Sequence, residues 1–353
     1  MTKVRKSNIE LLRVLSMFFI VFSHVTWEGH FIYPKENVLH NTEVQFPWLF
    51  GQIGVITFTL ISSYFLSKKK KINKKSIINL AKVTWFWSIL ILGITVLLKD
   101  NDLLGLKVFI NSLFPILRGT YWYVTAYIAM YLIMPYLNIV IDKLTKKEYI
   151  TFLMILIVVF SIIPTFAGTT SLNSTNSSSS VYSLIIIYFL GGFIRKFESE
   201  FVYPVKKLTC LFVVSVSISC GILLLLNIAN MHNIIDITGT NRLYGRFMRT
   251  NSIFQIISGT LLFLIFKNLE IRHNKYINGV AKNVFGIYII HTNPIVMEVL
   301  WNRIIRINRY ENSPYIILIE IIVAIVVFII CLLLEMIRGK FWMLCTKVVK
   351  KSN

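Results

Sequence analysis

Long runs of apolar residues, separated by short polar segments, recur along the whole chain. A hydrocarbon core about 30 Å thick needs roughly 20 apolar residues of helix to cross it. The segments that approach this length lie at about residues 9–28, 46–66, 77–98, 120–140, 149–167, 182–197, 205–229, 251–267, 280–302 and 314–337. The pattern therefore predicts an all-α polytopic integral membrane protein with about ten transmembrane helices.

The composition agrees with that reading. Hydrophobic residues make up 56% of the 353 residues, charged residues only 15%, and the mean hydropathy is +0.68. Soluble domains carry about 25% charged residues, so this chain has too few charges to cover a water-facing surface. We expect a single transmembrane domain over residues 1–353, with no fused soluble domain. The four cysteines show no metal-ligand spacing, and no metal is expected.

The charge map predicts an orientation. The net charge of +21 would favour nucleic-acid binding in a soluble protein, but membrane proteins keep Lys and Arg in their cytoplasmic loops. With the N-terminus inside, 25 of the 37 basic residues fall in the cytoplasmic segments, which are 1–8, 67–76, 141–148, 195–207, 267–282 and 338–353. We expect both termini to be cytoplasmic, with the lipid bilayer as a partner and no nucleic acid.

Three ionisable residues, Glu10, Arg13 and His24, lie on the first predicted span. Such side chains are costly in lipid unless they face a cavity or a partner. Arg13 and His24 share one helix face and differ in height by about 16 Å, and Glu10 can pair with Arg13. Taken singly, the arginine reads as a snorkelling residue and the histidine as a packing residue. Together they suggest the two ends of a cavity across the membrane.

Three motifs carry a family resemblance. They are NIELLR with a histidine eleven residues after its arginine, the aromatic segment WYVTAYIAMYLIMP, and the late segment GIYIIH. The chain thus resembles membrane acyltransferase family 3, the O-acyltransferases of bacterial cell-surface glycans. The resemblance implies a multi-pass protein of the bacterial plasma membrane. It also implies transfer of an acyl group, usually acetyl, from cytoplasmic acyl-CoA (acetyl-CoA) to a hydroxyl of a surface polysaccharide or its lipid-linked precursor.

The same resemblance implies that Arg13 serves the donor end and His24 the chemical end. A neutral imidazole suits both a general base and an acyl carrier, and the sequence leaves the two routes open. Where relatives carry an Arg-x-x-Arg pair at the third span, this chain offers Asn79 and Lys82. Lys82, with the lysines of the loop before it, is a candidate contact for the phosphates of the donor.

Other candidates belong to the acceptor side. Trp122 and Tyr123 can stack on sugar faces or belong to the interfacial aromatic belt. His291, near Tyr288 and the helix-kinking Pro294, is either a packing residue or part of the site. Outside arginines recur at helical spacing and suit an anionic acceptor, or they are solvated helix ends; they are Arg242, Arg246 and Arg249, with Arg303, Arg306 and Arg309 in a later segment.

A second function class stays open. A transporter or flippase of lipid-linked oligosaccharides would use the same cavity for passage without acyl transfer, so it would consume no acyl-CoA. Inverted repeats with broken helices are typical of transporters, and the sequence shows no such repeat. Homo-oligomers are compatible with either class.

Overall fold

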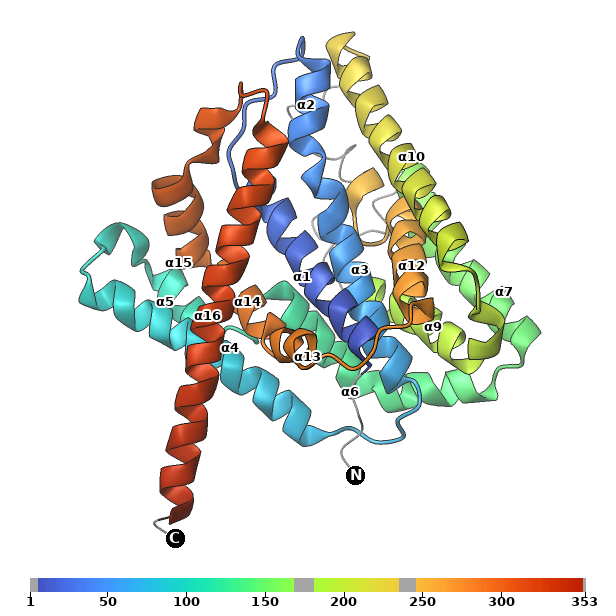
Figure 1. Ribbon diagram of the computed structural model, residues 1–353, viewed down its shortest axis with the longest axis horizontal. Coiled ribbons are helices and arrows are strands. Elements are labelled where there is room, and N and C mark those ends of the chain that lie inside the picture. The colour runs from blue at the N-terminus through green and yellow to red at the C-terminus, as the bar shows by residue number, and fades with distance from the viewer. Residues whose placement is uncertain (1–5, 168–180, 235–245, 352–353) are drawn as a thin grey trace.

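The computed structural model describes residues 6–167, 181–234 and 246–351, and this part of the chain is helical without any strand (Figure 1). Its α-helices are α1 (Ser7–Trp27), α2 (Val38–Gln45), α3 (Pro47–Leu66), α4 (Lys74–Leu97), α5 (Leu106–Leu113), α6 (Trp122–Lys143), α7 (Lys146–Ile157), α8 (Ile163–Phe166), α9 (Val181–Lys196), α10 (Val205–Met231), α12 (Ile253–Asn268), α13 (Lys275–Ala281), α14 (Val284–His291), α15 (Pro294–Met297) and α16 (Ile316–Lys351). Two π-helical segments, η2 (Val158–Ile162) and η4 (Glu298–Ile305), and three short 3-10 turns, η1 (Asn101–Leu103), η3 (Glu198–Phe201) and η5 (Ile307–Tyr310), complete the set.

Within the described residues, eight helices are long and apolar enough to cross a membrane, or nine if a bent pair counts as one span. The prediction of an all-α polytopic membrane protein is therefore confirmed. The predicted sixth span corresponds to α9, whose 16 residues rise about 24 Å and fall short of that length. The count of ten crossings, like the single-domain boundary, stays a prediction.

The predicted ninth span is broken. Its two halves, Lys275–His291 and Pro294–Tyr310, meet at an angle of 72°. Asn293 explains the break, because its side chain accepts hydrogen bonds from the backbone N–H groups of Ile295 and Val296 and so starts a new helix. Pro294 stands at the first helical position, where its missing N–H costs nothing.

Helix α1 lies in the middle of the bundle, beside α3 (Figure 1). Two glycines of α3 allow the close approach, since a side chain at Gly51 would meet Ser23 Oγ and one at Gly54 would meet the Ser16 carbonyl. Small residues serve this purpose in membrane bundles, where packing rather than the hydrophobic effect holds helices together. The first turn of α1 and the last turn of α16 lie toward the same side of the bundle (Figure 1).

The lysine-rich loop between α3 and α4 is fixed to α6. Asn138 donates to the carbonyls of Leu66 and Lys69 at 2.9 and 2.7 Å, and its own carbonyl accepts from the Tyr188 hydroxyl. The loop therefore has a defined place at the end of the bundle where α1 begins. We refer to this end as the Arg13 end and to the opposite one as the His24 end.

Candidate active site

Two histidines from distant parts of the chain meet inside the bundle. His24 lies in the last turn of α1 and His291 ends α14. His24 Nδ1 is 3.1 Å from His291 Nε2, and the ring centroids are 5.1 Å apart. His291 is fully buried, whereas His24 is partly exposed. The sequence left His291 open between a packing residue and a site residue, and the structure brings it to His24.

The hydrogen bonds of this pair define which nitrogen carries each proton. His291 Nδ1 lies 2.7 Å from the carbonyl oxygen of Ile287, which can only accept, so Nδ1 of His291 carries the hydrogen. In a neutral imidazole the other nitrogen, Nε2, is then an acceptor, and His24 Nδ1 must donate to it. This leaves Nε2 of His24 with a free lone pair. A general base and a nucleophile both require such a lone pair on an oriented imidazole.

The helix break that positions His291 is hydrogen-bonded to Tyr121, which precedes α6, and through Tyr121 to α4. Asn293 donates to the hydroxyl oxygen of Tyr121 at 2.8 Å, and that hydroxyl also lies 3.2 Å from Ser88 Oγ of α4. Tyr121 is buried just before α6 begins. It therefore connects the break to α4 and α6 and holds the end of α14 beside α1.

Tyrosines extend from the histidine pair along α6. The Tyr288 ring lies edge-on to His291 and to Tyr123, with centroids 6.2 and 6.1 Å away. Tyr123 is held at its hydroxyl by Thr59 of α3, 3.1 Å away. Of the aromatic candidates, Tyr123 and Tyr288 are thus joined to the histidine pair through ring contacts. Trp122 is partly exposed and packs edge-on against Tyr123.

The row continues toward the Arg13 end. Tyr123, Tyr127 and Tyr131 stack at four-residue spacing, with centroid separations of 6.0 and 6.1 Å. The Tyr131 hydroxyl accepts from the backbone N–H of Asn73, at the end of the lysine-rich loop. We name Tyr288, Tyr123, Tyr127 and Tyr131 the tyrosine row. Sequence reasoning missed Tyr127 and Tyr131, although the period of four in YVTAYIAMY was a signal for one helix face.

Arg13 lies beside this row. Its Nε is 3.5 Å from Glu10 Oε2, which confirms the expected ion pair, and its guanidinium carbon is 5.8 Å from the centre of the Phe58 ring. The Phe58 ring in turn lies edge-on to the Tyr123 ring, with centroids 6.0 Å apart. Arg13 thus occupies the interval between the lysine-rich loop and the histidine pair.

Lys82 has a different setting. It lies on the exposed side of α4, in line with Lys75 and Asn79 at helical spacing. Among the described residues no ion pair involves it. A role at the donor mouth therefore stays a prediction for Lys82. The described residues also contain no group of three or more His, Cys, Asp or Glu side chains arranged to hold a metal ion.

The arginines of the acceptor hypothesis have separate settings. Arg242 lies outside the described residues. Arg246 and Arg249 are partly buried, and the neighbouring Thr250 hydroxyl donates to Gln52 of α3 at 2.5 Å. Because Gly51 of α3 abuts Ser23, the residue before His24, this segment belongs to the His24 end.

In the later arginine segment, Arg303 is held by Asp100 at 2.5 Å, whereas Arg306 donates to the carbonyl of Asn302. Arg306 has a left-handed backbone at φ 46° and ends η4. Its charge has no carboxylate partner among the described residues.

An oriented imidazole with a free lone pair, inside a membrane-spanning helical bundle, has the features of a membrane-embedded transferase. Comparison with known protein families identifies which kind of transferase it is, because the family model described as 'Acyltransferase domain' matches residues 6–336. The chain belongs to this acyltransferase 3 family and is a multi-pass membrane acyltransferase. Comparisons with curated proteins and with solved structures found no match.

Proposed function

We propose that the protein transfers an acetyl group from cytoplasmic acetyl-CoA to a hydroxyl of a cell-surface glycan, or of its lipid-linked precursor, in a bacterial plasma membrane. The observation that carries the proposal is the hydrogen-bonded series of Ile287 carbonyl, His291 and His24, which leaves Nε2 of His24 with a free lone pair. The family membership supports acyl transfer in general. The donor, the acceptor and the role of His24 are the proposed part.

In the direct route, the acceptor hydroxyl gives its proton to His24 Nε2 as its oxygen attacks the thioester carbonyl. The carbon–sulfur bond breaks, and the CoA thiolate leaves and takes up the proton from His24. In the second route, Nε2 of His24 attacks the carbonyl itself, the carbon–sulfur bond breaks and the CoA thiolate leaves. The acceptor oxygen then takes the acyl group from Nε2, and the hydroxyl proton passes to the released thiolate. In both routes His24 becomes positively charged, and its Nδ1–H bond to His291 strengthens. His291 is therefore a positioning residue.

The donor would enter at the Arg13 end. Lysines of the loop before α4, with Arg13 and Lys82, supply positive charge for the phosphates of CoA. The tyrosine row connects this loop to His291, and an extended pantetheine arm would follow it in the proposed mechanism. Glu10 holds Arg13 in place through their ion pair.

The acceptor would approach at the His24 end. Arg246 and Arg249 supply charge for a phosphate or uronate group of the glycan. Trp122, partly exposed beside Tyr123, is available for stacking on a sugar ring.

One feature favours the alternative of a glycan transporter or flippase. Discontinuous helices near the middle of the membrane commonly form transport sites, and the pair at 72° is such a helix. The alternative differs in a measurable way, because a transporter moves the glycan without consuming acetyl-CoA.

The test uses the purified protein in liposomes, with radiolabelled acetyl-CoA on one side and the glycan acceptor on the other. We expect His24→Ala to lower the transfer rate by roughly 10²–10⁴-fold, the usual contribution of acid–base catalysis. Leu225→Ala, a change on the exposed face of α10, is the matched control and should retain the wild-type rate. Glycan movement without label transfer by the wild-type protein would favour the transporter.

A second measurement separates the two chemical routes. Incubation with labelled acetyl-CoA in the absence of an acceptor accumulates labelled protein only if His24 carries the acyl group. Hydroxylamine should then release the label, and His24→Ala should show none.

A further inference from the structure

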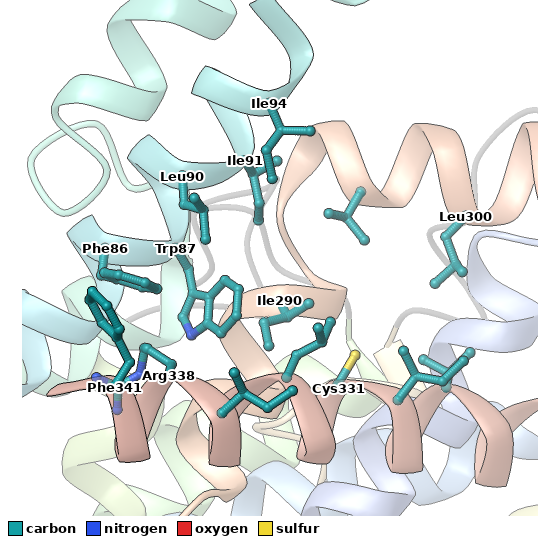
Figure 2. A pocket seen from close by; sticks show the side chains of 15 residues that line it. Phe86, Trp87, Leu90, Ile91, Ile94, Ile290, Leu300, Cys331, Arg338 and Phe341 are labelled. Atoms are coloured by element: carbon teal, nitrogen blue, oxygen red, sulfur yellow. The ribbon is translucent and has the colours of Figure 1, made fainter. Parts of the chain in front are cut away.

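An apolar groove opens on the side of the bundle, between α4, α16 and the bent pair (Figure 2). Its volume is about 480 Å³, within the range of roughly 300–1,000 Å³ that small-molecule sites occupy. We name it the lateral groove. In Figure 2, Trp87 and Leu90 of α4 face Cys331 and Arg338 of α16, with Ile290 of α14 between them.

The groove has a buried floor and an exposed rim. Trp87, Ile290 and Cys331 are at most 6% exposed, whereas Leu90 and Leu334 of the rim are 39% and 40% exposed. Helices α4 and α16 are both long and apolar enough to span the membrane. The groove therefore opens into hydrocarbon rather than into water, and its natural occupant is an apolar chain.

The length of the groove limits which chain fits. Its residues on α16 extend from Val327 to Phe341, a rise of about 21 Å. A hydrocarbon core of about 30 Å leaves only about 15 Å for each leaflet. Because Arg338 and Phe341 lie in the segment predicted to be cytoplasmic, the part of the groove inside the predicted span runs from Val327 to Ile337 and rises about 15 Å, a length that takes up the apolar chain of a membrane amphiphile.

At the Arg13 end the groove is closed by an ion pair, Glu335 with Arg338, that carries no net charge. Glu335 accepts two hydrogen bonds from Arg338, at 2.8 and 2.6 Å, and one from the Trp87 indole at 2.7 Å. The absence of a side chain at Gly286 makes room for Glu335 against α14. Because Arg338 is already paired, this end does not call for an anionic head group.

The His24 end of the groove differs in charge. The lining residue Leu300 belongs to η4, and Arg303 of the same segment is neutralised by Asp100, which follows α4. Arg306, at the end of η4, is exposed and lacks such a carboxylate among the described residues. Arg306 therefore offers a guanidinium for a phosphate at the His24 end of the bundle.

The groove also touches the active site through the chain itself. Ile290 forms part of its floor, and the next residue is His291, which holds His24. An amphiphile with its tail in the groove would hold its head group on the side of the membrane where His24 accepts the sugar hydroxyl.

From these observations we propose that the lateral groove binds the isoprenoid tail of a lipid-linked glycan acceptor, with a head-group phosphate at Arg306. The inference rests on the proposed function, and it selects the lipid-linked precursor over the finished polysaccharide as the substrate. The acetylated glycan would then need a later enzyme that moves it from the lipid carrier to the polymer.

The binding test needs no catalysis. The full-length protein is purified from vesicles of phosphatidylcholine that contain a polyprenyl phosphate, and bound lipid is counted by native mass spectrometry. Leu90→Trp and Leu334→Trp each fill the groove from a different helix. We expect either change to weaken polyprenyl phosphate binding about tenfold, which corresponds to 1.4 kcal/mol. Leu225→Trp, on the exposed face of α10, should leave binding unchanged.

A head-group variant tests the second part. Arg306→Asn removes the charge and keeps a residue that tolerates a left-handed backbone. We expect it to weaken binding of the polyprenyl phosphate several-fold and to leave binding of the uncharged polyprenol unchanged. Arg306→Lys, which retains the charge, should restore part of the phosphate binding.

Two results would overturn the proposal. One is equal polyprenyl phosphate binding by wild type and both filled variants. The other is displacement of polyprenyl phosphate by phosphatidylglycerol added at the same concentration, which would make the groove a general lipid site. If polyprenyl phosphate binds in the groove but acetyl-CoA is never consumed, the proposed chemistry fails and the binding site stands. If the protein acetylates a lipid-free glycan at a rate that groove filling leaves unchanged, the binding proposal fails and the chemistry stands.

Discussion

Replacement of His291 tests the central geometric argument. His291→Phe keeps a ring of similar size in a fully buried position but removes the acceptor of the His24 Nδ1–H bond. In the proposed reaction His24 becomes an imidazolium, and that bond is then one to a charged group, worth about 1.5–3 kcal/mol. Its loss therefore predicts a fall in kcat of roughly 10- to 150-fold, since each 1.36 kcal/mol is a factor of ten.

The assay is steady-state acetyl transfer in liposomes, with kcat and KM for acetyl-CoA measured separately. Because His291 has no contact with the donor in this mechanism, KM should change by less than about threefold. His291→Gln supplies a side-chain carbonyl as a substitute acceptor and should recover part of kcat. A His291→Phe protein with wild-type kcat would refute the orienting role, as would one that is as inactive as His24→Ala.

Two further predictions concern helix packing around the site. Glu320 is fully buried on α16 and accepts a hydrogen bond from the Thr26 hydroxyl of α1 at 3.1 Å. Glu320→Gln keeps an acceptor there, so its Tm should stay near the wild-type value. Glu320→Ala leaves the Thr26 hydroxyl unpaired and should lower the free energy of unfolding by about 1–3 kcal/mol. Equal Tm values for the two variants would contradict this. A side chain at Gly51 would collide with Ser23, so Gly51→Ala should destabilise the protein by about 1–3 kcal/mol and reduce kcat through the adjacent His24. Gly93→Ala, in open space on α4, is its control and should change neither Tm nor kcat.

The helices and the site differ in how far local sequence predicts them. Spans such as α1 and α16 follow from long apolar runs, because the bilayer sets the length and a helix satisfies its own backbone. The Arg13 and His24 alignment is also local, since both residues lie on one helix of known pitch. These features need no knowledge of which helices are neighbours.

The histidine pair needed more than local information. His24 and His291 are 267 positions apart, and their contact depends on a helix that breaks at Asn293 and is anchored to Tyr121. Sequence reasoning identified Pro294 as a kink but did not identify the capping role of Asn293. Tyr127 and Tyr131 of the tyrosine row were missed, because local sequence does not show which helices face that side of α6.

The break between α14 and α15 also places a helix terminus inside the bundle. A continuous span carries its terminal partial charges to the two aqueous surfaces, whereas α14 ends at His291, within the bundle. The carbonyls of a final turn carry partial negative charge, and a cation beside them gains about 0.3–1 kcal/mol, up to about 2 in partly buried settings. The end of α14 thus places a fixed partial negative charge near the imidazolium that His24 forms in the proposed reaction.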